Sequence, residues 1–208
     1  MRTGSRTWNQ QVLRSGASDR YGRLWRRLAV VMVMLVLLQT PALQAQQPKA
    51  SEYQVKATYL YNFSRFVQWP ANVAAVQGDS FPICVIGLDP FGAALDAILT
   101  GETIDGKNVV AKRVAKPQDA LNCRVLYISP SEDSRLKEIL AGVDKAGVLT
   151  VSDIPQFSRR GGMIQFVMDG NKIRFEVNLT SAQDAGLTLS SDLLKVATAV
   201  RKLSQPGD

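Results

Sequence analysis

The chain has 208 residues, enough for one domain with a sizeable core, and its 46% hydrophobic and 21% charged residues are ordinary for a globular protein. The formal charge of +7 comes from residues 1–45, which hold seven arginines and one acidic residue. The remaining residues, 18 basic and 17 acidic, are close to neutral. This balance argues against a nucleic-acid-binding surface. Histidine is absent, which excludes Ser-His-Asp and Cys-His nucleophiles and most catalytic metal sites.

Residues 1–45 have the form of a secretory signal peptide. Arginines at 20, 23, 26 and 27 precede an apolar run at 28–38, and a small residue, Ala45, ends the segment. The alternative is a retained membrane anchor. Eleven apolar residues rise only about 16 Å as a helix, short of the roughly 30 Å hydrocarbon core. We therefore predict cleavage after Ala45, export to the periplasm and a mature domain at 46–208.

The first element of the mature chain is predicted to be an amphipathic helix at 52–69, with Ser51 as its N-cap. A proline at position 70 would end it. Lys56 and Arg65 are expected to lie away from the core. The spacing of the apolar residues predicts three inward-facing aromatic side chains: Tyr59, Phe63 and Phe66.

Short, nearly continuous apolar runs at 81–87, 123–129 and 148–152 predict strands that are buried on both faces. An alternating strand is expected at 108–114. Helices are expected from Asp89 to about residue 99 and from Ser131 to about residue 140, each with its first residue as the N-cap. Alternating strands and helices predict an α/β fold with a mostly parallel sheet in one domain.

Residues 161–187 predict a β-hairpin with its turn at 169–171, followed by a short helix near 181–185 and a closing helix at 191–203. Three polar side chains alternate along the second strand and should share one face: Arg174, Glu176 and Asn178. One interpretation is a partner-contact surface, with Ile164 on the paired strand as an apolar neighbour. The other is a solvated face on which Glu176 and Arg174 form a local ion pair of little energetic value.

The chain resembles the YfiR-like family of periplasmic proteins over nearly all of its mature part. The resemblance is carried by blocks in the order 56–63, 66–70, 81–87, 104–107, 161–164, 175–178, 185–187 and 190–194. It implies an α/β fold with a Rossmann-like sheet, and a homodimer. Together with the residue patterns above, the expected fold is a sheet flanked by helices, with a C-terminal hairpin and closing helix. It also implies a repressor that binds the periplasmic domain of an inner-membrane diguanylate cyclase, which lowers cyclic di-GMP and biofilm formation. Redox change or envelope stress would release this repression.

The resemblance further implies a disulfide between Cys84 and Cys123, the two cysteines of the chain. The alternative is a pair of buried free thiols. The resemblance, taken from the name-giving member of the family, would also imply a second cysteine pair near the Gly-Gly segment of the hairpin. Ser158 and Gln165 flank that area here, and no cysteine is present.

No catalytic set, cofactor or metal site is predicted, so the chain is expected not to be an enzyme. The alternative function is a periplasmic module that binds a small ligand and signals to a membrane receptor such as a histidine kinase. Rossmann-like sheets bind ligands at the carboxyl ends of their strands, here residues 87–89 and 129–131.

Overall fold

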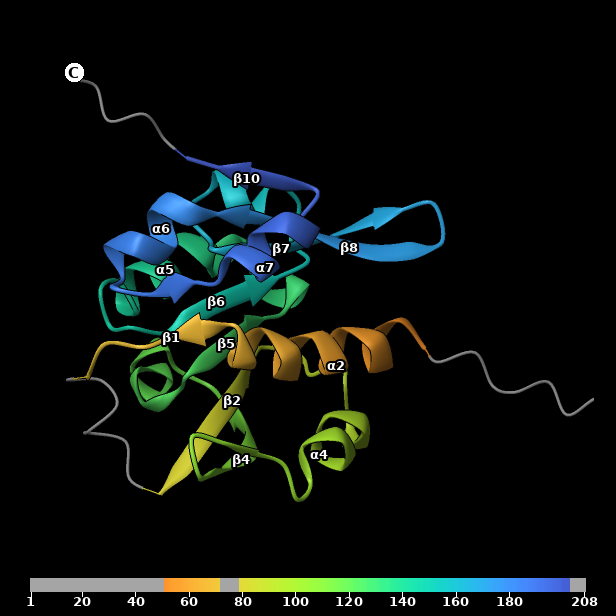
Figure 1. The fold of residues 1–208 in the computed structure, drawn as a ribbon, viewed down its shortest axis with the longest axis vertical. Helices are drawn as coiled ribbons and strands as arrows, with labels where there is room; N and C mark the ends of the chain where they lie inside the picture. The colour runs from red at the N-terminus through yellow and green to blue at the C-terminus, as the bar shows by residue number, and fades with distance from the viewer. Residues whose placement is uncertain (1–50, 72–78, 203–208) are drawn as a thin grey trace, which may run out of the picture. The chain divides into compact units, whose positions relative to one another are not determined.

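A computed structural model describes residues 51–71 and 79–202, and every structural statement below concerns that part of the chain (Figure 1). The predicted signal peptide and its cleavage point lie outside the described residues. No helix within the described ranges is long and apolar enough to cross a membrane.

The described residues form an eight-stranded sheet in the order β10-β8-β7-β6-β5-β2-β4-β3. Neighbouring strands from β4 through β7 run parallel, β8 is antiparallel to β7, and β10 is parallel to β8. The α/β fold with a mostly parallel sheet is therefore confirmed. The strands of this sheet are β2 (Ser80–Ile86), β3 (Thr103–Ile104), β4 (Lys107–Val114), β5 (Val125–Ile128), β6 (Leu149–Ser152), β7 (Ile164–Asp169), β8 (Lys172–Asn178) and β10 (Ala199–Arg201).

Each face of the sheet carries its own hydrophobic core. The first core contains side chains of four helices: α2 (Glu52–Arg65), α4 (Ala93–Leu99), α6 (Leu179–Asp184) and α7 (Ser191–Val196). The second core contains side chains of α5 (Leu136–Gly142) and of the 3-10 segments η1 (Pro117–Asn122) and η3 (Phe157–Arg159). A further 3-10 segment, η2 (Pro130–Arg135), precedes α5. Strand residues alternate between the two cores because successive side chains of a strand point to opposite faces.

Helix α2 begins as predicted at Ser51, which forms a capping box with Gln54. It ends at Arg65, four residues earlier than predicted, because Val67–Gln68 forms strand β1 and pairs with β9 (Thr188–Leu189). Phe66 was predicted to face inward, but it is 42% exposed.

The prediction for Lys56 was also wrong. Its side chain is only 3% exposed and lies on the buried face of α2, seven residues before Phe63. The exposure of Arg65 agrees with the prediction.

The closing helix differs from its prediction. Helix α7 ends at Val196, and Ala199–Arg201 forms β10 on the open edge of β8. Thr198 holds this segment against β8, because its backbone N–H and its side-chain hydroxyl both donate to the Phe175 carbonyl oxygen. Hydrogen bonding to a sheet edge therefore replaces the last turns of the predicted helix.

Two other helices begin later than predicted. Asp89 does not cap α4, which starts at Ala93 behind Gly92; its carboxylate accepts a hydrogen bond from the Phe91 N–H instead. Ser131 does not cap α5 either, because η2 comes first and has Ser129 as its cap.

Candidate functional site

The predicted hairpin is present, and Arg174, Glu176 and Asn178 lie on the same side of β8, opposite Phe175 and Val177 of the first core. Their exposure differs along the strand. Arg174 is half-buried near the outer end of the hairpin, and Asn178 is only 3% exposed. Arg174 has no ion-pair partner among the described residues.

Ile164 does not flank this face. It pairs with Val177 across the hairpin, is fully buried, and belongs to the first core. The strand residue beside Glu176 is Gln165. The predicted apolar neighbour therefore lies on the opposite side of the sheet, where it stabilises the fold and is inaccessible to a partner.

Glu176 lies in a hydrogen-bond network between η3 and β10. Its carboxylate accepts from the Ser158 hydroxyl at 3.0 Å and pairs with the Arg201 guanidinium at 3.1 Å. The second interpretation of this face paired Glu176 with Arg174, but the observed ion pair joins Glu176 to Arg201. Both contacts are made by the same carboxylate oxygen, Oε2. The Glu176 side chain is 23% exposed, so solvent still reaches the carboxylate.

Ser158 also bonds to Gln165: its backbone N–H and its hydroxyl lie 3.1 Å and 3.2 Å from the Gln165 side-chain oxygen. A hydroxyl has one proton, so Gln165 and Glu176 compete for it. Ser158 and Gln165 are the residues that flank the area in which the sequence resemblance leads one to expect a second cysteine pair. A polar contact joins the two positions in this chain, so redox chemistry at that point has no sulfur to act on.

Asn178 holds the face together and does not offer a free amide. Its side-chain N–H donates to the Ser158 carbonyl oxygen at 2.8 Å, and its side-chain oxygen accepts from the Ser181 N–H at 3.1 Å. It is the N-cap of α6. Asn178 therefore connects η3, β8 and α6.

Replacing Asn178 with alanine is expected to lower the free energy of unfolding by about 2 kcal/mol, because it removes a helix cap and leaves a buried carbonyl oxygen without its donor. Urea unfolding monitored by circular dichroism measures the change. The control is Asn122→Ala at an exposed position, which should stay within about 0.5 kcal/mol of the wild type. Equal effects of the two substitutions would contradict this role.

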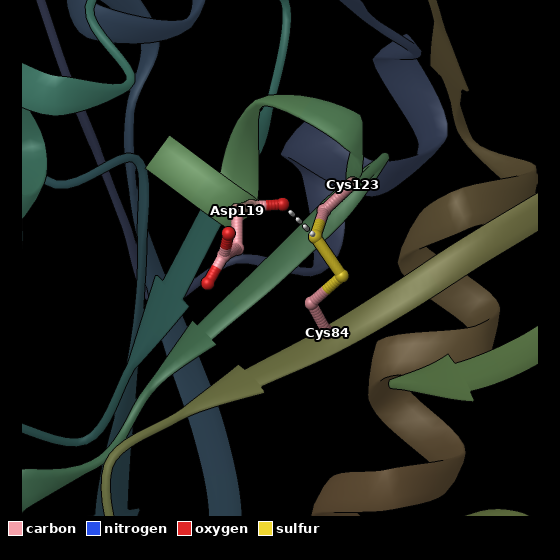
Figure 2. The surroundings of a disulfide bond; sticks show 3 residues. All are labelled: Cys84, Asp119 and Cys123. Carbon is pink, nitrogen blue, oxygen red and sulfur yellow. Dashed lines mark hydrogen bonds between the residues drawn. A yellow bond between two sulfur atoms is a disulfide. The ribbon is translucent and has the colours of Figure 1, made fainter. Parts of the chain in front are cut away.

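The structure contains the disulfide between Cys84 and Cys123 (Figure 2). Cys84 belongs to β2, and Cys123 directly follows η1, with Cα atoms 5.9 Å apart. The Asp119 carbonyl oxygen lies 3.9 Å from the Cys123 Sγ. A disulfide sulfur has no proton to donate, so this is a packing contact. Both cysteines are at most 1% exposed, inside the second core.

A charged cluster around the buried Lys56 side chain, at the carboxyl ends of β5 and β6, was missed by sequence reasoning. The Lys56 ammonium donates to the Asp153 carboxylate at 2.6 Å and also pairs with Glu52. Asp153 also accepts a hydrogen bond from the Tyr127 hydroxyl at 2.6 Å. The ammonium lies 4.7 Å from the centre of the Tyr53 ring. The spacing of Lys56 from Leu60 and Phe63 was the available signal, since all three share one helix face.

Two segments of the chain meet at the crevice in which Rossmann-like sheets bind ligands. It lies between the carboxyl ends of β2 and β5, whose neighbouring helices cover opposite faces. The Ser131 hydroxyl accepts a hydrogen bond from the Leu88 N–H at 2.9 Å. A Cβ at Gly87 would lie 2.5 Å from the same hydroxyl oxygen. Residues 87–89 and 129–131 are thus in contact with each other.

The sequence profile of the YfiR/HmsC-like family matches residues 53–198. The chain belongs to this family. Membership supports, in general terms, a periplasmic regulator of a diguanylate cyclase. The YfiR/HmsC-like domain described here therefore includes the hairpin, the disulfide and the Lys56 cluster.

Two solved structures are similar to this YfiR/HmsC-like chain. One is a conserved domain protein from Vibrio cholerae, with 13% identity, a TM-score of 0.50, and coverage of 70% of this chain and 60% of that one. The other is an ABC domain from Streptococcus pneumoniae in complex with L-Trp, with 12% identity, a TM-score of 0.46, and coverage of 62% and 58%. The chain thus spans about 60% of the length of these proteins. At 13% identity the likeness to the first structure concerns the fold alone. Nothing is inferred from the second structure, because its TM-score is below 0.5.

Proposed function

We propose that this chain is a periplasmic regulatory protein that binds the periplasmic domain of an inner-membrane diguanylate cyclase and holds the cyclase inactive. The observation that carries the proposal is the family match over residues 53–198. Binding lowers cyclic di-GMP and with it biofilm formation, and the active form is a homodimer. The protein works by occupying a surface of its partner, with no chemical step of its own.

The docking face is the side of the hairpin that carries Arg174 and Glu176. Arg174 has no carboxylate partner among the described residues, so it is available for an acidic group of the partner. Glu176 is held in position by Ser158 and Arg201 but remains 23% exposed. Asn178 stabilises this face by donating a side-chain hydrogen bond to the Ser158 carbonyl oxygen, which holds Ser158 in place beside Glu176. A preorganised polar face of this kind favours one docking orientation.

Affinity capture tests the proposal. The full chain, tagged at its C-terminus and expressed in its host, is crosslinked in intact cells and purified from solubilised membranes. The expected result is co-purification of a membrane protein with a periplasmic domain and a cyclase output domain. Recovery of only a histidine kinase would favour a different receptor, and recovery of no membrane protein would contradict the proposal.

Glu176→Lys is expected to reduce the yield of captured cyclase at least tenfold. The substitution places a cation beside Arg201 and Arg174 and reverses the charge that the partner meets. Quantitative mass spectrometry of the captured cyclase measures the yield, and the melting temperature of the purified variant shows that it is folded. The matched control is Glu138→Lys, a fully comparable charge change at a side chain that is 61% exposed on α5. If Glu176→Lys captures the cyclase as well as the control does, the docking face is wrongly assigned.

A further inference from the structure

A groove of about 450 Å³ lies between α2 and α7, on the face of the sheet opposite Glu176. Its walls are mostly apolar and aromatic: Tyr59, Phe63, Phe66, Phe175, Leu193 and Val196. Two of these side chains are large and exposed, Phe66 by 42% and Val196 by 61%. Apolar side chains that gather around one groove, unlike those scattered singly on a surface, indicate a binding site.

The groove is preformed, because backbone hydrogen bonds tie its two walls together. The Ser190 N–H donates to the Phe66 carbonyl oxygen at 2.9 Å, and the Ser190 hydroxyl caps α7 by accepting from the Leu193 N–H. Directly after Phe66, β1 pairs with β9. A ligand would not have to order either wall of the groove, which would lower the entropic cost of association.

The floor of the groove is an aromatic cluster. Phe63 and Phe175 pack edge to face with ring centres 4.9 Å apart, and Tyr59 lies 5.9 Å from Phe175. Edge-to-face packing fixes the orientation of these rings. The floor thus presents a rigid apolar surface to whatever enters the groove.

Charge defines the second property of the occupant. Among the residues that line the groove, Arg65 is the one that is charged. Its guanidinium lies 5.9 Å from the centre of the Tyr61 ring, and it has no ion-pair partner within residues 51–71 and 79–202. An acidic side chain beside the inserted apolar groups would complement it.

We propose that this groove binds an amphipathic helix in the periplasmic domain of the membrane partner. Apolar side chains spaced three and four residues apart enter the groove, and a neighbouring carboxylate pairs with Arg65. The residues that line the groove come from α2, its C-cap and α7, and from Phe175 of β8, a strand already paired on both sides by β7 and β10. A helix suits such a groove, because it satisfies its own backbone hydrogen bonds. The inference rests on the proposed function and adds a second contact surface for the same partner.

Site-specific photocrosslinking tests the groove. Benzoylphenylalanine replaces Phe66 or Val196 in the full chain, expressed in its host, and cells are irradiated. Both positions are expected to form adducts with the membrane sensor, and the crosslinked peptide should be an apolar helix with acidic residues. The reference position is Leu88, which is 77% exposed and lies beyond β2, and it should give no sensor adduct. Arg65→Glu should lower the adduct yield from Val196 on the order of tenfold, whereas the exposed control Lys112→Glu should not.

The outcomes separate the groove from the proposed function. If affinity capture recovers the sensor but neither groove position crosslinks to it, the groove assignment is wrong and the proposed function stands. Adducts with a second copy of this chain, in place of the sensor, would also overturn the assignment. If neither capture nor crosslinking recovers a membrane sensor, both proposals fail.

Discussion

Replacing Lys56 with methionine is expected to lower the free energy of unfolding by about 3 kcal/mol. The substitution keeps most of the side-chain volume and leaves the Asp153 carboxylate without its cation. Breaking one half of a buried ion pair typically costs about 3–5 kcal/mol. The lower value is expected because Tyr127 still donates a hydrogen bond to Asp153. Urea unfolding of the purified domain, monitored by circular dichroism, measures the change.

The matched control is Lys195→Met. Lys195 pairs with Asp192 at 3.1 Å, but both side chains are 73% exposed. Exposed pairs of this kind contribute little, so the control should change stability by less than about 0.5 kcal/mol. A second substitution, Asp153→Leu, should restore part of the stability of Lys56→Met by removing the uncompensated charge. If Lys56→Met is as mild as the control, the cluster does not hold α2 to the sheet.

The same cluster predicts a direction for pH dependence. Burial opposes the charged form of Lys56, but hydrogen bonds to Asp153 and Glu52 outweigh it and hold its pKa above the ordinary value of 10.5. Burial, together with Asp153, raises the pKa of Tyr127 as well. A raised pKa contributes stability that is complete below the unfolded-state pKa and is lost as the pH rises toward the folded-state value. Stability from this cluster should therefore be constant near neutral pH and fall above about pH 10.

Removing the disulfide with Cys84→Ala and Cys123→Ala is expected to lower the free energy of unfolding by about 3–4 kcal/mol. The bond joins residues 39 positions apart, and closing a loop of this length restricts the unfolded chain by about that amount. Alanine avoids burying a hydroxyl group where the sulfur atoms lay. Urea unfolding of the double variant, beside the wild type with and without dithiothreitol, measures the effect.

The wild type unfolded in dithiothreitol should match the double variant, because both lack the bond in the unfolded state. Without denaturant, the wild type should keep its disulfide in dithiothreitol, since both sulfur-bearing residues are at most 1% exposed and exchange needs access to a sulfur atom. Alkylation followed by mass spectrometry follows the bond. Rapid reduction of the native protein would contradict a purely structural role and would favour a redox switch at this position.

The parts of the fold that could be predicted from the sequence are those set by local patterns. Continuous apolar runs marked β2, β5 and β6, and the Asp-Gly-Asn turn marked the hairpin. The end of the last helix could not be predicted, because β10 depends on hydrogen bonds that Thr198 makes with Phe175, 23 residues away. The secondary-structure propensities of residues 197–201 do not indicate that Thr198 will bond to Phe175.

The polar residues of the hairpin could be predicted from the sequence, but the surroundings of the candidate site could not, because they depend on contacts between distant parts of the chain. The burial of Lys56 depends on Asp153, a partner that is 97 residues away in the chain, so local spacing alone does not predict it. The error at Ile164 was avoidable. A two-residue loop pairs Asp169 with Lys172, and counting back along the hairpin places Ile164 opposite Val177, one residue away from Glu176.

The central claim is that this chain restrains a diguanylate cyclase, and the intracellular level of cyclic di-GMP tests it most directly. The level is measured by liquid chromatography and mass spectrometry in the host, in a strain that lacks the gene, and in that strain supplied with the wild-type or the Glu176→Lys chain. We predict that cyclic di-GMP rises several-fold in the deletion strain, returns to the original level with the wild-type chain, and stays high with Glu176→Lys. An unchanged level in the deletion strain, grown under conditions in which the protein is produced, would contradict the account.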